Sequence, residues 1–399
     1  MVNKKILLIS TIFSTPVAEK GTSVCNYFTK EWARAGNDVI AIYLHTNYPK
    51  VLYWVANQAM KFVESKTGAV VYNKQDKNDY CFSIDGVKVC QFPIFKYIPH
   101  GKYMRHSIDS AYEKILNTLQ SFSFVPDVIV GHFPNPQIEL ISRLKGEYKI
   151  AKTAIVMHGY NYHIKSVYGE KFSFFKKNID VWGFRSKAIL ADFEIRYGKP
   201  KKSFICHSGI PEYYLKERRE RDDKIPLKNF IFCGQLIARK YPAKVLEALD
   251  MVYENNEFRL IYIGEGNERI TIEKKSKERD NIKLLGYVPR KETIKMMDEA
   301  DCMIMISKSE AYGLVYLEAM SRGCITIASK NEGMDGVIVD GENGFLCEAG
   351  NADELAKIIR KINKFSSDEI TRIRRNAMKT VERLTDAKVA EDYLGQLEE

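Results

Sequence analysis

Two glutamates with seven residues between them, Glu310 and Glu318, lie in the stretch 307–323, which reads S-K-S-E-A-Y-G-L-V-Y-L-E-A-M-S-R-G. The residues from Leu314 onward are strong helix formers, so the pattern predicts Glu310 at a helix N-terminus and Glu318 inside the helix. The free N–H groups of a helix N-terminus suit an anion such as phosphate. A glutamate among apolar residues needs a hydrogen-bond partner, and a ribose diol offers two donors to one carboxylate. The stretch is therefore a candidate nucleotide-binding site.

The same two residues also allow a simpler interpretation. Glu310 can act as a helix-capping acid, and Glu318 can pair with a nearby Lys or Arg. Most helical glutamates lie on a solvated surface, so the spacing alone leaves both interpretations open.

The stretch closely resembles the E-x7-E signature of retaining family 4 glycosyltransferases of the GT-B fold. The flanking residues that match the family pattern are Ser309, Gly313, Leu314, Leu317, Ala319, Met320 and Gly323. The resemblance implies that Glu310 contacts hydroxyls of the donor sugar and that Glu318 binds the nucleotide ribose. It also implies transfer with retention at the anomeric carbon, by front-side attack without a protein nucleophile, in a hexosyltransferase-type enzyme.

The elements that must position the two glutamates are indicated by two short apolar runs. Residues 302–306 and 324–328 are continuous apolar stretches, typical of strands buried on both faces. Arg322 and Gly323 supply a C-terminal cation and a stop for the helix between them. The pattern predicts strand, loop, helix and strand, with Glu310 delivered by the loop.

The start of the chain repeats this kind of pattern. Residues 5–10 and 38–44 are predicted strands, and residues 22–35 between them are a predicted helix. Because strand, glycine loop, helix and strand open a doubly wound domain, we expect a second Rossmann-like domain here.

The resemblance predicts an α/β protein of the GT-B fold, with two doubly wound Rossmann-like domains facing across a cleft. We expect residues 1–210 to form an N-terminal acceptor-binding domain and residues 211–384 a C-terminal nucleotide-sugar-binding domain. Residues 385–399 are expected to form a helix that packs back on the first domain.

A second family pattern, G-R-L-x-x-x-K-G, supplies an Arg and a Lys that bind the donor diphosphate. The residues at its fixed positions in this chain are Gly234, Gln235, Leu236, Lys240 and Tyr241. Lys240 matches and is predicted to be catalytic, whereas Gln235 replaces the Arg and brings no charge. Arg239 is adjacent and can compensate from a different geometry.

The resemblance places further residues at the donor: Gly21, Gly264, Gly266, Tyr287, Val288, Ala311, Tyr312, Gly313 and Leu314. No D-x-D occurs in the sequence, so no metal is predicted, and no cofactor is expected because the nucleotide sugar is a substrate. The charge on the departing diphosphate is then met by Lys240 and by the N–H groups of residues 311–314.

Two predicted strands end in histidine, at His132 and His158. Ligands of open α/β sheets collect beyond the carboxyl ends of the strands, although a lone histidine there is often structural. Family members commonly carry a histidine after the second of these strands, so the resemblance favours His158 as a catalytic residue over His132.

Charge is unevenly distributed along the chain. Residues 1–210 carry 29 Lys and Arg against 16 Asp and Glu, a balance of +13 within a total of +10. This predicts an anionic partner for the first half, such as an anionic membrane surface or a lipid-linked acceptor, with generic solubility as the alternative. No nucleic-acid-binding motif is visible. We expect a cytoplasmic protein, peripheral on the inner membrane face.

Eight cysteines are present without any C-x2-C pair, and several lie in apolar runs. This usage predicts reduced core thiols rather than disulfides or a zinc site.

The resemblance implies transfer of a sugar from a UDP- or GDP-sugar to a hydroxyl of a glycan or lipid-linked glycan, in cell-surface polysaccharide synthesis. Three alternatives stay open: a nucleotide-sugar 2-epimerase of the same architecture, a glycan phosphorylase, and a degenerate non-catalytic subunit that binds sugar nucleotides. Fold alone does not separate them, because function resides in the site.

Overall fold

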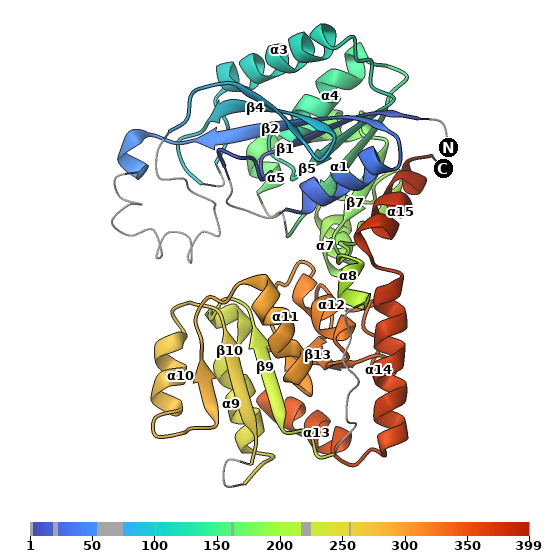
Figure 1. The fold of residues 1–399 in the computed structure, drawn as a ribbon. Helices are drawn as coiled ribbons and strands as arrows, with labels where there is room; N and C mark the ends of the chain where they lie inside the picture. The colour runs from blue at the N-terminus through green and yellow to red at the C-terminus, as the bar shows by residue number, and fades with distance from the viewer. Residues whose placement is uncertain are drawn as a thin grey trace. The chain divides into compact units, whose positions relative to one another are not determined.

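The computed structural model describes residues 3–18, 23–53, 75–99, 101–160, 163–216, 225–254 and 257–398. The chain divides into two compact units (Figure 1). The first unit comprises residues 1–185, 190–206 and 390–399, and the second comprises residues 186–189 and 207–389.

The first unit is built on a sheet with the strand order β3-β4-β2-β1-β5-β6-β7-β8. Neighbouring strands are parallel except for β3 and β4. The strands are β1 (Lys5–Ser10), β2 (Asp38–Asn47), β3 (Tyr80–Ile84), β4 (Val87–Phe95), β5 (Val128–His132), β6 (Lys152–Met157), β7 (Val181–Phe184) and β8 (Ser203–Ile205). The helices are α1 (Val24–Arg34), α3 (Arg105–Ser121), α4 (Gln137–Glu147), α5 (Ile164–Tyr168), α6 (Lys171–Lys177), α7 (Lys187–Tyr197) and α15 (Asp386–Glu398).

Helix α1 forms because its apolar residues recur at helical spacing. Val24, Phe28 and Trp32 are buried along one face, while the opposite face is polar. The C-terminal α15 packs beside it: the Trp32 indole N–H donates to the Ala390 carbonyl (2.9 Å), and the rings of Trp32 and Tyr393 pack edge to face at 5.3 Å. Helices α3 and α4 lie on the other side of the sheet from α1 (Figure 1).

The hairpin formed by β3 and β4 contains a disulfide, contrary to the prediction of reduced thiols. Its antiparallel register places Cys81 directly opposite Cys90, and the two form a disulfide. The sequence predicted reduced thiols, and for this pair the prediction was wrong. The spacing of eight residues around the turn at Asp85 and Gly86 becomes informative only once the hairpin register is known. The other six cysteines, all within the described segments, form no disulfide.

The second unit is built on a parallel sheet with the order β11-β10-β9-β12-β13-β14. The strands are β9 (Asn229–Cys233), β10 (Arg259–Ile263), β11 (Ile282–Leu284), β12 (Cys302–Ile304), β13 (Ile325–Ser329) and β14 (Phe345–Cys347). The helical segments are α8 (Tyr213–Lys216), the 3₁₀ turn η1 (Ala238–Lys240), α9 (Pro242–Asp250), α10 (Arg269–Lys275), α11 (Arg290–Glu299), α12 (Leu314–Ser321), α13 (Ala352–Ile362) and α14 (Ser367–Glu382).

The strand order of the second unit fixes where a ligand can bind. From β9 the chain proceeds outward through β10 and β11, and then returns to place β12 on the opposite side of β9. This reversal is a topological switch point, and loops that leave adjacent strands there in opposite directions open a crevice at the carboxyl ends. A ligand site is therefore expected at the loops that follow β9 and β12.

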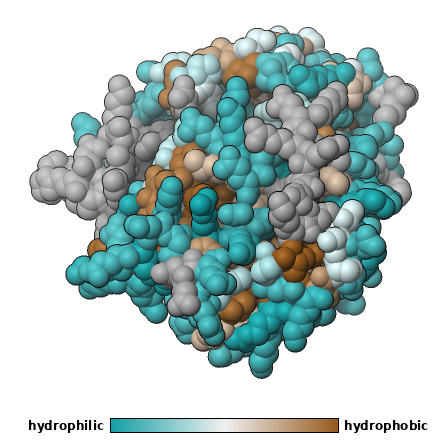
Figure 2. Space-filling model, turned by 60° about the horizontal axis from the view of Figure 1, so that its bottom comes forward, coloured by the Kyte–Doolittle hydropathy of each residue, from teal (hydrophilic) through white to brown (hydrophobic). Residues whose placement is uncertain are grey.

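No helix in the described segments is long and apolar enough to cross a membrane. The face drawn in Figure 2 is mostly hydrophilic, and its hydrophobic residues form scattered patches.

Candidate active site

The loops after β9 and β12 bring Lys240 and Glu310 together at the switch point. The Lys240 Nζ lies 3.1 Å from Glu310 Oε2, and the Arg239 guanidinium lies 3.9 Å from the same oxygen. The Ser307 hydroxyl donates to it across 3.4 Å. The side chains of Lys240 and Glu310 are only 12% and 14% exposed, so this pair attracts more strongly than one in open water.

Lys240 reaches this place through a tight turn. Strand β9 ends at Cys233, the chain passes through η1, and Tyr241 then adopts a left-handed conformation (φ 48°) before Pro242 starts α9. The left-handed conformation explains why the family pattern has Gly at this position, since Gly adopts it without strain. Tyr241 takes the same conformation despite its side chain.

Gln235 and Arg239 are both exposed at this turn. Arg239 also donates to the carbonyls of Lys308 and Ser309, at 3.5 and 3.4 Å, so it lies along the loop that carries Glu310. The structure thus places a guanidinium beside the glutamate although the position of the family Arg is occupied by Gln235.

Glu318 lies on α12 and is 9% exposed. The Arg290 Nε, at the start of α11, donates to Glu318 Oε1 across 2.6 Å, and its guanidinium lies over the Tyr214 ring at 5.4 Å. Burial raises the pKa of the Glu318 carboxyl, and the Arg290 charge opposes this effect. The pairing with an Arg matches the simpler interpretation of Glu318, but it engages Oε1 and is compatible with a diol bound at Oε2.

The N-terminus of α12 adjoins Glu310. Gly313 has a left-handed conformation (φ 86°), and Leu314 is the first helical residue. Tyr312 is buried and donates its hydroxyl to the Ser208 carbonyl (2.9 Å), while Ala311 is partly exposed. This turn lies at the same end of the sheet as Lys240, because the one follows β12 and the other follows the parallel neighbouring strand β9.

At Gly264 and Gly266 the backbone of the loop after β10 passes close to the backbone of the loop after β9. A Cβ on Gly264 would lie 2.0 Å from the Gly234 carbonyl oxygen, and one on Gly266 would lie 2.2 Å from that of Leu236. No side chain fits between these backbones. The neighbouring loop after β11 carries Tyr287, which is 83% exposed, and Val288, which is partly exposed.

Two residues of this site were missed by the sequence reasoning. Arg290 contacts Glu318, and the Glu332 carboxylate accepts the backbone N–H groups of Ser309 and Glu310 at 2.9 and 2.8 Å. Each lies more than twenty residues from the glutamate it serves, so no local pattern pointed to it.

His132 and His158 belong to the first unit, where they form a cluster of their own. The His132 Nδ1 and the His158 Nε2 are 2.8 Å apart, the Phe133 ring stacks on His158 at 4.0 Å, and the Tyr393 hydroxyl lies 3.4 Å from His132 Nε2. Burial lowers the pKa of His132 to about 3 and lowers that of His158 as well. Both rings are therefore neutral near pH 7. Gly21 lies outside the described residues.

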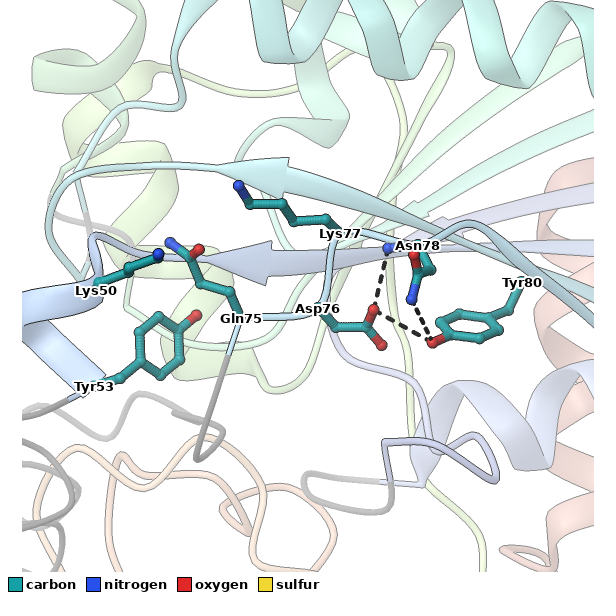
Figure 3. A pocket seen from close by; sticks show the side chains of 7 residues that line it. All are labelled: Lys50, Tyr53, Gln75, Asp76, Lys77, Asn78 and Tyr80. Carbon is teal, nitrogen blue, oxygen red and sulfur yellow. Dashed lines mark hydrogen bonds between the residues drawn. The ribbon is translucent and has the colours of Figure 1, made fainter.

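The first unit also holds a cavity of about 610 Å³, close to the end of β2 (Figure 3). It is lined by Lys50, Tyr53, Gln75, Asp76, Lys77, Asn78 and Tyr80. Asp76 Oδ1 accepts the Asn78 N–H (3.1 Å) and the Tyr80 hydroxyl (3.4 Å), so the carboxylate is engaged while both lysines face the cavity. In the described segments no group of His, Cys, Asp and Glu is placed to hold a metal ion.

Comparison with known proteins finds a family model that matches part of the chain, and relatives that resemble most of it. Residues 216–380 match the family model described as "Glycosyl transferases group 1". An uncharacterized glycosyltransferase of Methanocaldococcus jannaschii is 24% identical over 316 residues, which span 77% of this chain and 83% of that protein. The lipopolysaccharide core biosynthesis glycosyltransferase LpsE of Rhizobium meliloti is 23% identical over 244 residues, 59% of this chain and 65% of that protein.

Solved structures agree in fold. The Anabaena protein HepE in complex with UDP has a TM-score of 0.69 at 14% identity, with 99% of both chains covered. A glycosyltransferase from Rickettsia africae has a TM-score of 0.72 at 15% identity, covering 100% of this chain and 98% of that one. The predicted GT-B fold is therefore confirmed, as is the resemblance to glycosyltransferases. The chain therefore has the GT-B fold and resembles glycosyltransferases, and its residues 216–380 match the glycosyl transferases group 1 model.

Proposed function

We propose that the protein transfers a sugar from a UDP- or GDP-sugar to a hydroxyl of a glycan or lipid-linked glycan, with retention at the anomeric carbon. The observation that carries this proposal is the Lys240–Glu310 pair at the switch point of the second unit, beside the N-terminus of α12. A cation and free N–H groups suit a diphosphate, and an adjacent carboxylate suits sugar hydroxyls.

The leaving diphosphate gains charge as its bond to the sugar breaks. Lys240 and the N–H groups of residues 311–314 would stabilise this charge, with Arg239 supplying the guanidinium that Gln235 lacks. A bound diphosphate would compete with Glu310 for Lys240 and so turn the glutamate toward the sugar. Transfer is then expected to persist in EDTA, and activity that is abolished by EDTA and restored by magnesium would contradict this assignment.

Retention follows if both bonds change on one face of the sugar. The bond from the anomeric carbon to the diphosphate oxygen breaks, the acceptor oxygen bonds to the same face, and the acceptor proton passes to the departing diphosphate. Glu310 would lie close to the positive charge that develops on the sugar in this step. Glu318 would hold the ribose diol through Oε2.

The acceptor is assigned to the first unit. A cavity with two lysines and two tyrosines suits a glycan that carries an anionic group, since the rings can pack against sugar faces. His158 is proposed as the second catalytic residue. Being neutral, it can exchange a hydrogen bond with a hydroxyl without carrying charge. A role in cell-surface polysaccharide synthesis is supported by the name of the Rhizobium relative. A cytoplasmic location at the inner membrane face is part of the same proposal.

A thermal-shift panel of UDP-, GDP- and ADP-sugars tests the donor, because a ligand that binds the native state raises its melting temperature. We expect stabilisation by a UDP- or GDP-sugar, followed by transfer to an acceptor hydroxyl. Stabilisation without transfer would instead favour a degenerate binding subunit, which the Gln235 replacement already suggests as the second candidate. Conversion of the donor without any acceptor would indicate an epimerase.

A further inference from the structure

The loop that carries Glu310 is held from two sides. On one side the Lys308 N–H donates to the Arg239 carbonyl (2.7 Å), which ties the loop to η1. On the other side the Glu332 carboxylate accepts two consecutive N–H groups, that of Ser309 at Oε1 (2.9 Å) and that of Glu310 at Oε2 (2.8 Å). The Glu310 side chain thus pairs with Lys240, while its backbone N–H donates to the carboxylate of Glu332.

The geometry of the loop explains why a carboxylate fits there. Ser309 has a left-handed conformation (φ 56°), which is uncommon for a residue other than Gly. A left-handed residue in such a turn directs successive N–H groups to one point and forms a concavity that binds anions. Glu332 fills this concavity with an internal anion, and bonds from N–H groups to a carboxylate are stronger than those to a neutral oxygen.

Glu332 is itself fixed by its own loop. After β13 the Lys330 N–H donates to the Cys347 carbonyl (2.9 Å), and the Asn331 N–H donates to the Asp335 carboxylate (2.6 Å). A Cβ on Gly333 would lie 2.6 Å from the Tyr312 nitrogen, so the two loops touch through their backbones. The loop after β13 is thus held by its own hydrogen bonds and by a backbone contact, and the Glu332 carboxylate reaches the Glu310 loop from a fixed position.

We propose that Glu332 is a positioning residue, which fixes the backbone of Glu310 and thereby the distance between the Glu310 carboxylate and the donor sugar. This inference rests on the proposed function, because it assigns Glu332 to the catalytic step of the same site. Glu318, which is proposed to hold the ribose, and its partner Arg290 lie on other elements, so nucleotide binding should not depend on the two hydrogen bonds to Glu332. Loss of the hydrogen bonds from the Ser309 and Glu310 N–H groups to Glu332, here called the Glu332 clamp, should then raise the free energy of the transition state. The affinity for the nucleotide should not change.

The variant Glu332→Gln tests the proposal, since its amide offers one acceptor and turns a donor toward a backbone N–H. We expect kcat to fall by about tenfold or more, with unchanged affinity for the bare nucleoside diphosphate. In a Glu310→Gln background the same change should have little further effect, because the residue it positions is already disabled. An additive double variant, or a wild-type kcat in Glu332→Gln, would overturn the proposal.

Asp301 supplies a matched control in the same unit. Its Oδ2 accepts the consecutive N–H groups of Lys228 and Asn229 at 2.9 and 2.8 Å, but at the amino end of the sheet. Asp301→Asn breaks the same kind of clamp and should lower the melting temperature while leaving kcat unchanged. If both variants reduce kcat equally, the effect of Glu332 is merely structural.

Hydrogen exchange gives a readout that does not depend on activity. The amides of Ser309 and Glu310 should exchange faster in Glu332→Gln than in the wild type, whereas those of Lys228 and Asn229 should respond only to Asp301→Asn. Unchanged exchange at Ser309 and Glu310 would refute the clamp even if transfer is never detected. A wild type that transfers no sugar would refute the proposed function alone. Glu332→Asp, which keeps the charge on a shorter side chain, is expected to be intermediate in both measurements and serves if the Gln variant does not fold.

Discussion

Glu310 and Glu318 belong to one motif but have different surroundings. Glu310 faces two cations, Lys240 and Arg239, at the end of the sheet, and its position depends on a loop. Glu318 lies on a helix, is more deeply buried and pairs with Arg290. The Glu310 carboxylate, beside the proposed site of the leaving group, suits a role in the chemical step. The Glu318 carboxylate, fixed on a helix, suits a role in nucleotide binding.

This difference predicts separable effects of two substitutions. Glu318→Ala should weaken nucleotide binding by about 1.5–3 kcal/mol and raise KM with little change in kcat, because the ribose contact persists throughout the reaction. Glu310→Gln keeps the shape and removes the charge, so it should lower kcat and leave the affinity for bare nucleotide nearly unchanged. Calorimetry with the nucleoside diphosphate measures the nucleotide affinity of each variant, and steady-state kinetics with the sugar donor measure its KM and kcat. Weaker nucleotide binding in Glu310→Gln, with normal binding in Glu318→Ala, would reverse the two roles.

The Arg290–Glu318 pair predicts a pH dependence of stability. Glu318 is faced by the Arg290 guanidinium from α11, the Tyr214 phenol from α8 and the Cys233 thiol at the end of β9. Burial already raises the pKa of Glu318, and Arg290→Gln removes the charge that opposes this rise. Above the raised pKa the variant buries an unpaired carboxylate, which should cost about 1–2 kcal/mol, because Arg290 itself is a third exposed. Below that pKa the carboxyl binds a proton and the cost disappears.

Denaturant unfolding across pH checks this prediction. The difference in free energy of unfolding between wild type and Arg290→Gln should be widest above the raised pKa of Glu318 and should narrow as the pH falls through it. Lys244→Gln is the control, since Lys244 pairs across 3.0 Å with Glu247 and the two side chains are 44% and 32% exposed. That exposed pair should give a small difference at every pH. A difference for Arg290→Gln that stays constant with pH would show that Glu318 does not titrate as described.

At the scale of elements, the strands and helices around the site were predictable and the contacts between their loops were not. The apolar runs 302–306 and 324–328 were recognisable because strands buried on both faces have no polar alternation, and they became β12 and β13. Helix α12 began at Leu314 as predicted. Arg290 and Glu332 meet Glu318 and Glu310 only because parallel strands bring distant loops to one edge. That arrangement is a property of the sheet order, which no local pattern contains.

The glycines of the loop after β10 give a prediction at this scale. Gly264 has φ 133° and no room for a Cβ, which would lie 2.0 Å from the Gly234 carbonyl oxygen. Gly264→Ala must therefore push the β9 and β10 loops apart and should destabilise the protein by about 2–4 kcal/mol. Gly146, on α4, has no atom within 4 Å of an added Cβ, so Gly146→Ala should be neutral or stabilise by up to about 1 kcal/mol. Thermal unfolding compares the two, and equal melting temperatures would contradict the close approach of the loops.

At the scale of the whole molecule, the net positive charge is concentrated in the first half of the chain. Residues 1–210 carry the balance of +13, which the remainder does not share. Helix α6 shows how this charge can act together with an apolar contact. Phe174 is 64% exposed and lies three residues from both Lys171 and Lys177, so all three share one helix face. An aromatic ring between two lysines suits an anionic lipid surface, where the ring enters the interface and the lysines meet the head groups.

We therefore expect the protein to sediment with anionic vesicles at low salt and to remain in solution with neutral ones, and we expect salt to release it. The double variant Lys171→Glu/Lys177→Glu should weaken this binding by about 4 kcal/mol at most, because each reversed charge exchanges roughly 1 kcal/mol of attraction for a similar repulsion. Lys274→Glu/Lys275→Glu on α10 changes net charge equally in the second unit and should bind like the wild type if the first unit makes the contact. Equal recovery on neutral and anionic vesicles would remove the electrostatic argument altogether. Equal losses in the two double variants would show that net charge, rather than the α6 face, governs binding.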